Sequence, residues 1–277
     1  SWLASARVQE GRLNDAVRLY REQRVILEEL RRAQPEALAW AHQLVLADKL
    51  EGILLTAQGR EDEAIARIAD GVAMITMLLS KEPGNLLWLR DEADLRIVGS
   101  RLYLSQGRVS DAGAEISRAL AQVEKASSAP AAQTADFRRV IVQAHVQQAH
   151  VLLRQGSLKE AGGHLAKAET MAREVPRDDR GAALMANVLL MRAMLERTGG
   201  GAEQAGALCR EAADTVRAAA QTSQDSTILA PWVRANLCAG TPSAAQRGIS
   251  ILEKAGYKDA DYQRALSSLK EMKDVQQ

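Results

Sequence analysis

The sequence has few aromatic residues, few cysteines and few prolines. Only 3% of its 277 residues are Phe, Trp or Tyr, and it contains two cysteines and six prolines. Alanine, in contrast, occurs 49 times. Because aromatic and β-branched residues favour strands and alanine is the strongest helix former, this composition favours an all-α protein and disfavours a sheet protein.

An excess of one charge and long apolar runs are also missing. The formal net charge is +1, with 36 basic and 35 acidic residues, so no overall field attracts nucleic acid or an anionic membrane. No apolar run approaches the ~20 residues that a membrane-spanning helix needs. We therefore expect no nucleic-acid partner and no direct membrane insertion of this segment. The chain is 47% hydrophobic, which is too apolar for intrinsic disorder.

The two cysteines, Cys209 and Cys238, stand too far apart for a CxxC motif or a thiolate metal site. They neither require nor exclude an oxidising compartment. Arginine outnumbers lysine 27 to 9, which together with the alanine excess suggests a bacterial source with a GC-rich genome. Two locations remain open for this chain. One is the cytoplasm, and the other is the periplasm, where the chain would be the exported domain of a membrane-anchored protein.

One short pattern recurs five times, a glycine followed five residues later by an alanine. The five alanines are Ala16, Ala64, Ala112, Ala161 and Ala205, which stand 48, 48, 49 and 44 residues apart. Prolines keep nearly the same step at Pro35, Pro83, Pro130 and Pro176. Two independent markers in phase predict an internal repeat of about 48 residues.

Each repeat is predicted to contain two helices. In the second repeat, apolar spacing predicts a helix over Leu38–Ala57, which Gly59 ends. Acidic residues at 61–63 mark the first turn of a second helix, which stops before Pro83. The expected fold is a single all-α solenoid of helix-turn-helix repeats over 1–277. Its repeats are placed at roughly 1–34, 35–82, 83–129, 130–175 and 176–225, followed by a degenerate capping region over 226–277.

Residue size also recurs around each repeated alanine. Small residues stand twelve positions before it, at Ala4, Gly52, Ser100, Ala149 and Ala193. Bulky ones stand four positions after it, at Tyr20, Ile68, Ile116, Leu165 and Cys209. Small residues return seven positions after it, at Gly71, Ala119, Ala168 and Ala212. Small side chains let two helix axes approach closely, so we interpret these as packing positions without chemistry.

This pattern resembles the tetratricopeptide repeat (TPR) family over about residues 1–220. The resemblance implies a right-handed α-solenoid whose first helices line a concave surface that binds proteins or peptides. The period of about 48 residues departs from the family's 34, so the expected fold is called TPR-like. The repeats look similar to those attached to bacterial signalling proteins such as membrane-anchored kinases and winged-helix regulators.

The family pattern also implies which side chains line the concave groove. Counted back from each alanine, they include Lys49, Ile53, Asp94, Arg101, Gln143, His150, Arg154, Asn187, Met194 and Arg197. Apolar side chains bordered by cations fit an extended or helical peptide that carries acidic groups. The alternative, given equal weight, is that these side chains pack against neighbouring repeats or meet only water.

Residues arranged for catalysis or metal binding are not evident. His145 and His150 are five apart, so they do not share the helix face that an i,i+4 metal pair needs. The Asp91–Asp94 tetrapeptide matches a helicase motif, but the sequence has no phosphate-binding GxxxxGK[ST] loop. We expect a protein that is not an enzyme and has no cofactor.

The function expected from these observations is a non-catalytic scaffold for protein-protein interaction. It would be the regulatory or sensor domain of a larger bacterial signalling protein, with a protein or peptide partner. Only ten residues precede Gly11, too few for a full first helix, so we expect a fragment of a longer protein. The alternative is a homo-oligomerisation module, with a homodimer as its simplest form.

Overall fold

The computed structural model describes residues 2–127 and 134–275, without the side chains of residues 127 and 269–275. These residues form 13 helices and no strand, so the expected all-α class is confirmed. None of the described helices combines the length and apolarity that crossing a lipid bilayer requires. The predicted boundary between repeats 83–129 and 130–175, with Pro130, lies outside the described residues. The helices are α1 (Trp2–Gln9), α2 (Leu13–Ala33), α3 (Leu38–Ala57), α4 (Glu61–Lys81), α5 (Leu86–Ser105), α6 (Val109–Ser127), α7 (Ala135–Arg154), α8 (Leu158–Ala172), α9 (Asp179–Thr198), α10 (Ala202–Thr222), α11 (Ser226–Cys238), α12 (Gln246–Lys254) and α13 (Ala260–Val275).

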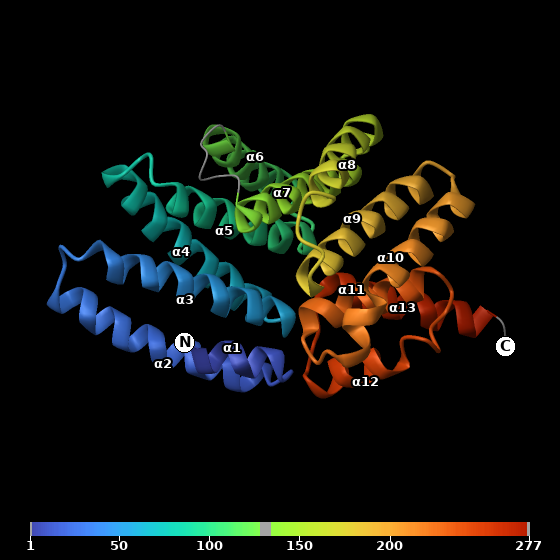
Figure 1. The fold of residues 1–277 in the computed structure, drawn as a ribbon, viewed down its shortest axis with the longest axis horizontal. Coiled ribbons are helices and arrows are strands. Elements are labelled where there is room, and N and C mark those ends of the chain that lie inside the picture. The colour runs from blue at the N-terminus through green and yellow to red at the C-terminus, as the bar shows by residue number, and fades with distance from the viewer. Residues whose placement is uncertain (1, 128–133, 276–277) are drawn as a thin grey trace.

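Consecutive helices pack against each other as hairpins, from α1/α2 to α9/α10 (Figure 1). Helix α3 spans Leu38–Ala57, as predicted, and α4 ends at Lys81, before the proline. Gly59 lies between them with φ 70°, a left-handed conformation that glycine adopts without steric cost. The other four repeated glycines also have positive φ, at Gly11, Gly107, Gly156 and Gly200. The recurring glycine therefore marks the turn of each hairpin.

The repeated small residues lie where the helices of a hairpin cross. All five repeated alanines, from Ala16 to Ala205, are fully buried. A Cβ placed on Gly52 of α3 would lie 2.7 Å from the Cδ1 atom of Ile68 on α4, so only glycine fits this contact as it stands. The prediction that these are packing positions is confirmed.

The hairpins are arranged in an arc that runs from α1/α2 over α5–α8 to α9/α10 (Figure 1). The first helices α3, α5, α7 and α9 contact their neighbours in series, so they form one continuous inner layer. This arrangement is consistent with a helical solenoid. The right hand of the superhelix and the 48-residue period remain predictions from the sequence.

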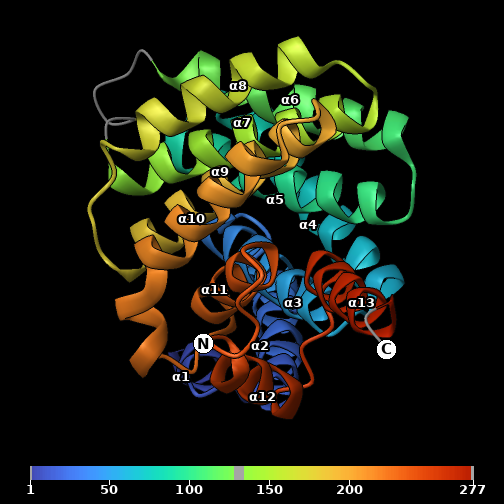
Figure 2. The ribbon, with the colours of Figure 1, turned by 90° about the vertical axis from the view of Figure 1, so that its right-hand side faces the viewer.

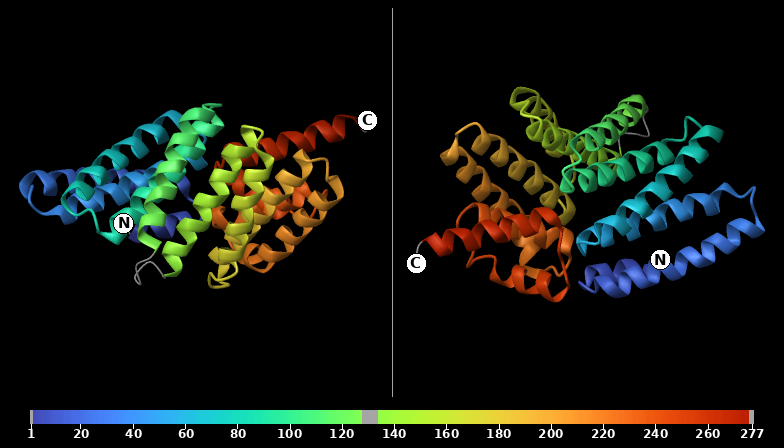
Figure 3. Two further views of the ribbon diagram at one scale, coloured as in Figure 1. Left: turned by 90° about the horizontal axis from the view of Figure 1, so that it is seen from above. Right: turned by 180° about the vertical axis from the view of Figure 1, so that it is seen from behind.

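The C-terminal helices fold back against the first hairpins, which the sequence did not reveal. Figures 1 and 2 place α11, α12 and the start of α13 beside the ends of α1–α3, while the rest of α13 points away from them, and the rear view in Figure 3 agrees. The backbone N–H of Lys258 donates a 2.6 Å hydrogen bond to the carbonyl of Ala57, 201 residues earlier. The predicted polar terminal helix over 261–273 is present as α13, but it follows a segment that joins the two ends of the arc.

Candidate functional site

A hollow lies on the inner face, where α3, α5 and α7 meet the segment between α12 and α13. It is shallow, with a cavity volume of about 20 Å³. Its lining includes Thr56, Arg101, Leu104, His150, Asp259 and Asp261. Residues 255–264 are called the closing segment from here on. Two residues predicted for the groove, Arg101 and His150, are therefore brought together, and carboxylates from the C-terminal end face them.

Arg101 and Asp259 form the ion pair at the centre of this hollow. The Arg101 guanidinium on α5 lies 3.3 Å from Oδ2 of Asp259. The other carboxylate oxygen, Oδ1, accepts hydrogen bonds from the backbone N–H groups of Asp261 and Tyr262, at 3.0 and 3.3 Å. Asp259 is thus the N-cap of α13, a position where aspartate is favoured because it satisfies free N–H groups. One carboxylate both starts the helix and pairs with the inner face.

Asp261 is surrounded by cations. It lies 3.7 Å from Arg234 of α11, and it also pairs with Arg264. Burial alone would raise the pKa of Asp261, but Arg234, Arg101 and Arg264 hold that pKa well below its usual range. The carboxylate is therefore ionised at neutral pH. Neither carboxylate could be predicted from the sequence, because Arg101 and Arg234 lie far from Asp259 and Asp261 along the chain.

Lys49 and Asp94 do not line an open groove. The Lys49 ammonium is buried and donates hydrogen bonds to Asp91 at 3.1 Å and Asp94 at 2.9 Å. His42 Nε2 lies 2.8 Å from the other oxygen of Asp91, which has no exposed surface. Adjacent first helices, α3 and α5, pack closely enough to remove these charges from water. The prediction that Lys49 is available to a ligand is corrected on this ground.

Two further predicted residues also have partners within the chain. Ile53 is half-buried and packs against the apolar core of the first hairpins. The amide oxygen of Asn187 accepts a long, 3.5 Å hydrogen bond from Arg234 of α11. Ile53 and Asn187 therefore agree with the alternative expectation, in which the predicted groove residues pack against neighbouring helices instead of facing a ligand.

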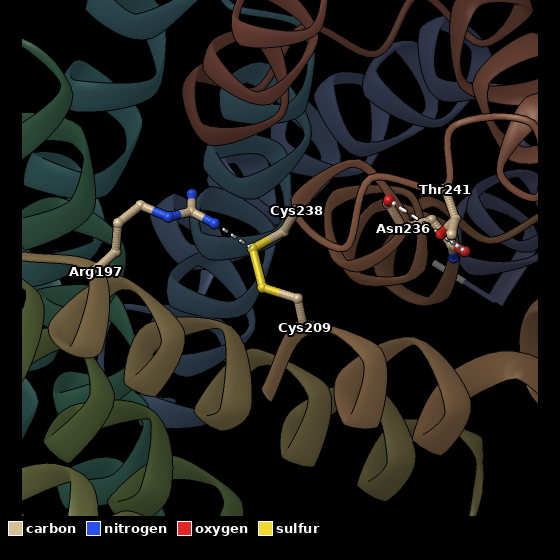
Figure 4. Close-up of a disulfide and its surroundings, with 5 residues drawn as sticks. All are labelled: Arg197, Cys209, Asn236, Cys238 and Thr241. Carbon is tan, nitrogen blue, oxygen red and sulfur yellow. Dashed lines mark hydrogen bonds between the residues drawn. A yellow bond between two sulfur atoms is a disulfide. The ribbon is translucent and has the colours of Figure 1, made fainter. Parts of the chain in front are cut away.

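Four predicted residues are exposed. Gln143 and Arg154 lie on α7, seven residues before and four residues after His150, so all three share one helix face. Met194 is 36% exposed on α9. Arg197 is exposed and donates a 3.3 Å hydrogen bond to the Sγ atom of Cys238 (Figure 4). The open part of the inner face thus begins at α7 and continues onto α9.

Cys209 and Cys238 form a disulfide that joins α10 to the end of α11 (Figure 4). Cys209 was interpreted as a packing residue without chemistry, and this is corrected: it is fully buried, but it is covalently bonded. Near the same end of α11, the Thr241 hydroxyl donates hydrogen bonds to the backbone carbonyl and the side-chain oxygen of Asn236 (Figure 4). A 29-residue separation gives no motif from which the pairing could have been read.

His145 and His164 form a second polar cluster. Their Nδ1 atoms, on α7 and α8, lie 2.9 Å apart, although the two residues are 19 apart in sequence. Within the described part of the chain, no group of three or more His, Cys, Asp or Glu side chains is arranged to hold a metal ion. Burial lowers the pKa of His145 to about 4, with the neighbouring His164 and Lys167 acting in the same direction.

Stability is expected to fall as the pH drops from about 6.5 to 4. Burial also lowers the pKa of His150 from its ordinary value of 6.5 to about 4. Both His145 and His150 are neutral in the folded chain and take up a proton when it unfolds, so acid favours unfolding. Each shift corresponds to roughly 3 kcal/mol across this interval. Urea denaturation at several pH values measures the effect, and His150→Gln should flatten the slope. Burial raises the pKa of Asp48 to about 7, which acts in the opposite direction, so an identical pH dependence in the wild type and in His150→Gln is the result that would contradict the expectation.

The fold has a counterpart among solved structures. The crystal structure of BtubC (BKLC) from P. vanneervenii matches with a TM-score of 0.55, over 88% of this chain and 90% of that chain. The two sequences are 13% identical, so the likeness concerns the fold alone. It supports a helical-repeat architecture. No protein-family model matches the chain, and no curated protein matches its sequence.

Proposed function

We propose that this chain is a non-catalytic scaffold that binds an acidic polypeptide segment on its inner face. The observation that carries the proposal is the hollow beside α5 and α7, where the Arg101 guanidinium already pairs with the carboxylate of Asp259. Gln143 and Arg154 extend this surface along α7 and are exposed. Charge-assisted hydrogen bonds from arginine to a carboxylate are among the strongest that such a surface makes. A right-handed, TPR-like solenoid with a period of about 48 residues is part of the proposal.

The disulfide bears on where such a scaffold works. Disulfides persist in oxidising compartments and are rare in the reducing cytosol. The Cys209–Cys238 bond therefore supports an exported, periplasmic domain over a cytoplasmic one. We propose that the chain serves as the regulatory or sensor domain of a larger bacterial signalling protein, outside the cytoplasm.

Arg154→Glu is expected to reduce partner binding at least tenfold, because it places a negative charge where an acidic segment would dock. Arg154 is exposed, so its replacement should leave the fold intact. Arg210→Glu, on an exposed site of α10, is the matched control and should bind like the wild type. The measurement is capture from source-cell extract followed by quantitative mass spectrometry. If every captured protein is recovered equally with both variants, the inner face is not the binding surface.

A homo-oligomerisation module is the second candidate, and one surface favours it. Val25 and Ile26 of α2 are each 57% exposed, and Trp2 of α1 is 85% exposed. Val25 and Ile26 are neighbours on α2, and adjoining exposed apolar side chains are more typical of interfaces than single ones are. Light scattering across a range of concentrations tests this candidate, since a strict monomer at every concentration would eliminate it.

A further inference from the structure

The closing segment has the composition of a peptide ligand. It carries two carboxylates, Asp259 and Asp261, between two aromatic residues, Tyr257 and Tyr262. Tyr262 is fully buried in the C-terminal core, whereas Tyr257 packs partly buried against both that core and the core of the first hairpins. The two rings meet edge to face with centroids 5.3 Å apart. The aromatic group that touches the first hairpins is therefore Tyr257.

The contacts of the closing segment with the inner face are those that a separate peptide would make. The N–H of Lys258 donates to the carbonyl of Ala57, the last residue of α3. Carbonyls in the last turn of a helix have no partner within it, so they are available to a chain that passes the helix end. Arg101 of α5 pairs with Asp259. One main-chain hydrogen bond, one carboxylate and one ring together define a recognition site.

These contacts are few and partly open to water. The Arg101 side chain is 47% exposed, although its partner Asp259 is buried, so water reaches the ion pair from the Arg101 side and weakens it. The core that holds α11, α12 and Tyr262 is built from α9, α10 and the C-terminal helices themselves, and Tyr257 links it to the core of the first hairpins. The part of the closing segment that precedes α13 can therefore leave the inner face while Tyr262 stays in the C-terminal core.

We propose that the closing segment is an intramolecular ligand, and that the partner of the inner face has the same chemistry. That partner is an acidic segment with an aromatic residue followed two positions later by a carboxylate, as in Tyr257 and Asp259. Partner and closing segment compete for Arg101 and the Ala57 carbonyl, so the free chain inhibits its own binding site. This inference rests on the proposed function and names the class of partner.

The test uses a hexapeptide with the sequence of residues 257–262, blocked at both ends, and the full chain. Asp259→Asn removes the charge that pairs with Arg101 but keeps the N-cap of α13, because asparagine caps a helix as well as aspartate does. Since apparent affinity scales with the open fraction, the variant should bind the peptide about fivefold more tightly than the wild type. Adding Arg101→Glu to the variant should abolish binding. Calorimetric titration measures these affinities, and a peptide with both aspartates changed to asparagine is the control.

Hydrogen exchange at the Lys258 amide gives an independent readout of competition. Saturating peptide should speed exchange of this amide several-fold, because the closing segment is displaced from the Ala57 carbonyl. Amides in α9 and α10 should keep their rates. The proposal is overturned if Asp259→Asn does not raise peptide affinity, or if bound peptide leaves the Lys258 amide protected. Either failure would leave the Arg154→Glu capture result standing, so the two ideas are separable.

Discussion

Replacing Asp91 with alanine is expected to lower the free energy of unfolding by about 3–5 kcal/mol. Asp91 has no exposed surface and accepts hydrogen bonds from Lys49, at 3.1 Å, and from His42, at 2.8 Å. Burial alone would raise the pKa of Asp91, yet His42, Lys49 and Arg90, which also donates to it at 3.1 Å, hold that pKa well below its usual range. Without this carboxylate, the buried Lys49 ammonium retains only Asp94. Removing one member of a buried ion pair costs more than the pair contributes, because the remaining charge stays out of water.

Urea denaturation followed by circular dichroism measures this change. Asp70→Ala is the control, since Asp70 is half-exposed and pairs with Arg67 at the surface. It should cost under about 1 kcal/mol. Combining Asp91→Leu with Lys49→Met should recover much of the loss, because both charges are then removed together. If Asp91→Ala and Asp70→Ala are equally mild, the α3–α5 contact is not a desolvated network.

Loss of the disulfide is expected to cost about 3–4 kcal/mol. The bond closes a loop between Cys209 and Cys238, 29 residues apart, and restricts the unfolded chain accordingly. Cys238→Ser and reduction of the wild type with a strong thiol reductant should produce the same loss, since both open the loop. Denaturation curves with and without reductant measure it.

Thiol titration provides the control for this prediction. The native chain should have no reactive thiol, because both of its cysteines are in the bond. A native chain with two free thiols and a reductant-independent free energy of unfolding would contradict the prediction. That result would also remove the support for an oxidising compartment.

The hairpins could be predicted because their signals are local. Gly59 ends α3 through its own backbone geometry, and the acidic residues after it suit the first turn of α4. Ala64 could be assigned to a helix crossing because its size repeats in phase with four other alanines. Short stretches of sequence are enough to determine both the local backbone conformation and the repeated pattern of residue size.

The contacts across the arc could not be predicted, because they join residues far apart in the chain. Arg101 and Asp259 are 158 positions apart, and neither residue type indicates its partner. Lys49 was counted as a groove residue since its register on α3 is correct, but the register does not show how closely α5 approaches. That approach buries Lys49 with Asp91. Desolvation of a charge depends on the packing distance between helices, which the repeat pattern leaves open.

The most direct test of the account is the position of the closing segment in solution. Spin labels at Ala66→Cys on α4 and Gln263→Cys on α13, both exposed sites, report the distance between the first hairpins and the C-terminal end. Pulsed electron paramagnetic resonance should give one narrow distance distribution for the free chain. Adding the 257–262 peptide should produce a second, longer population. A broad distribution in the free chain, or a narrow one that saturating peptide leaves unchanged, would contradict a closing segment that occupies the binding face and yields it to a partner.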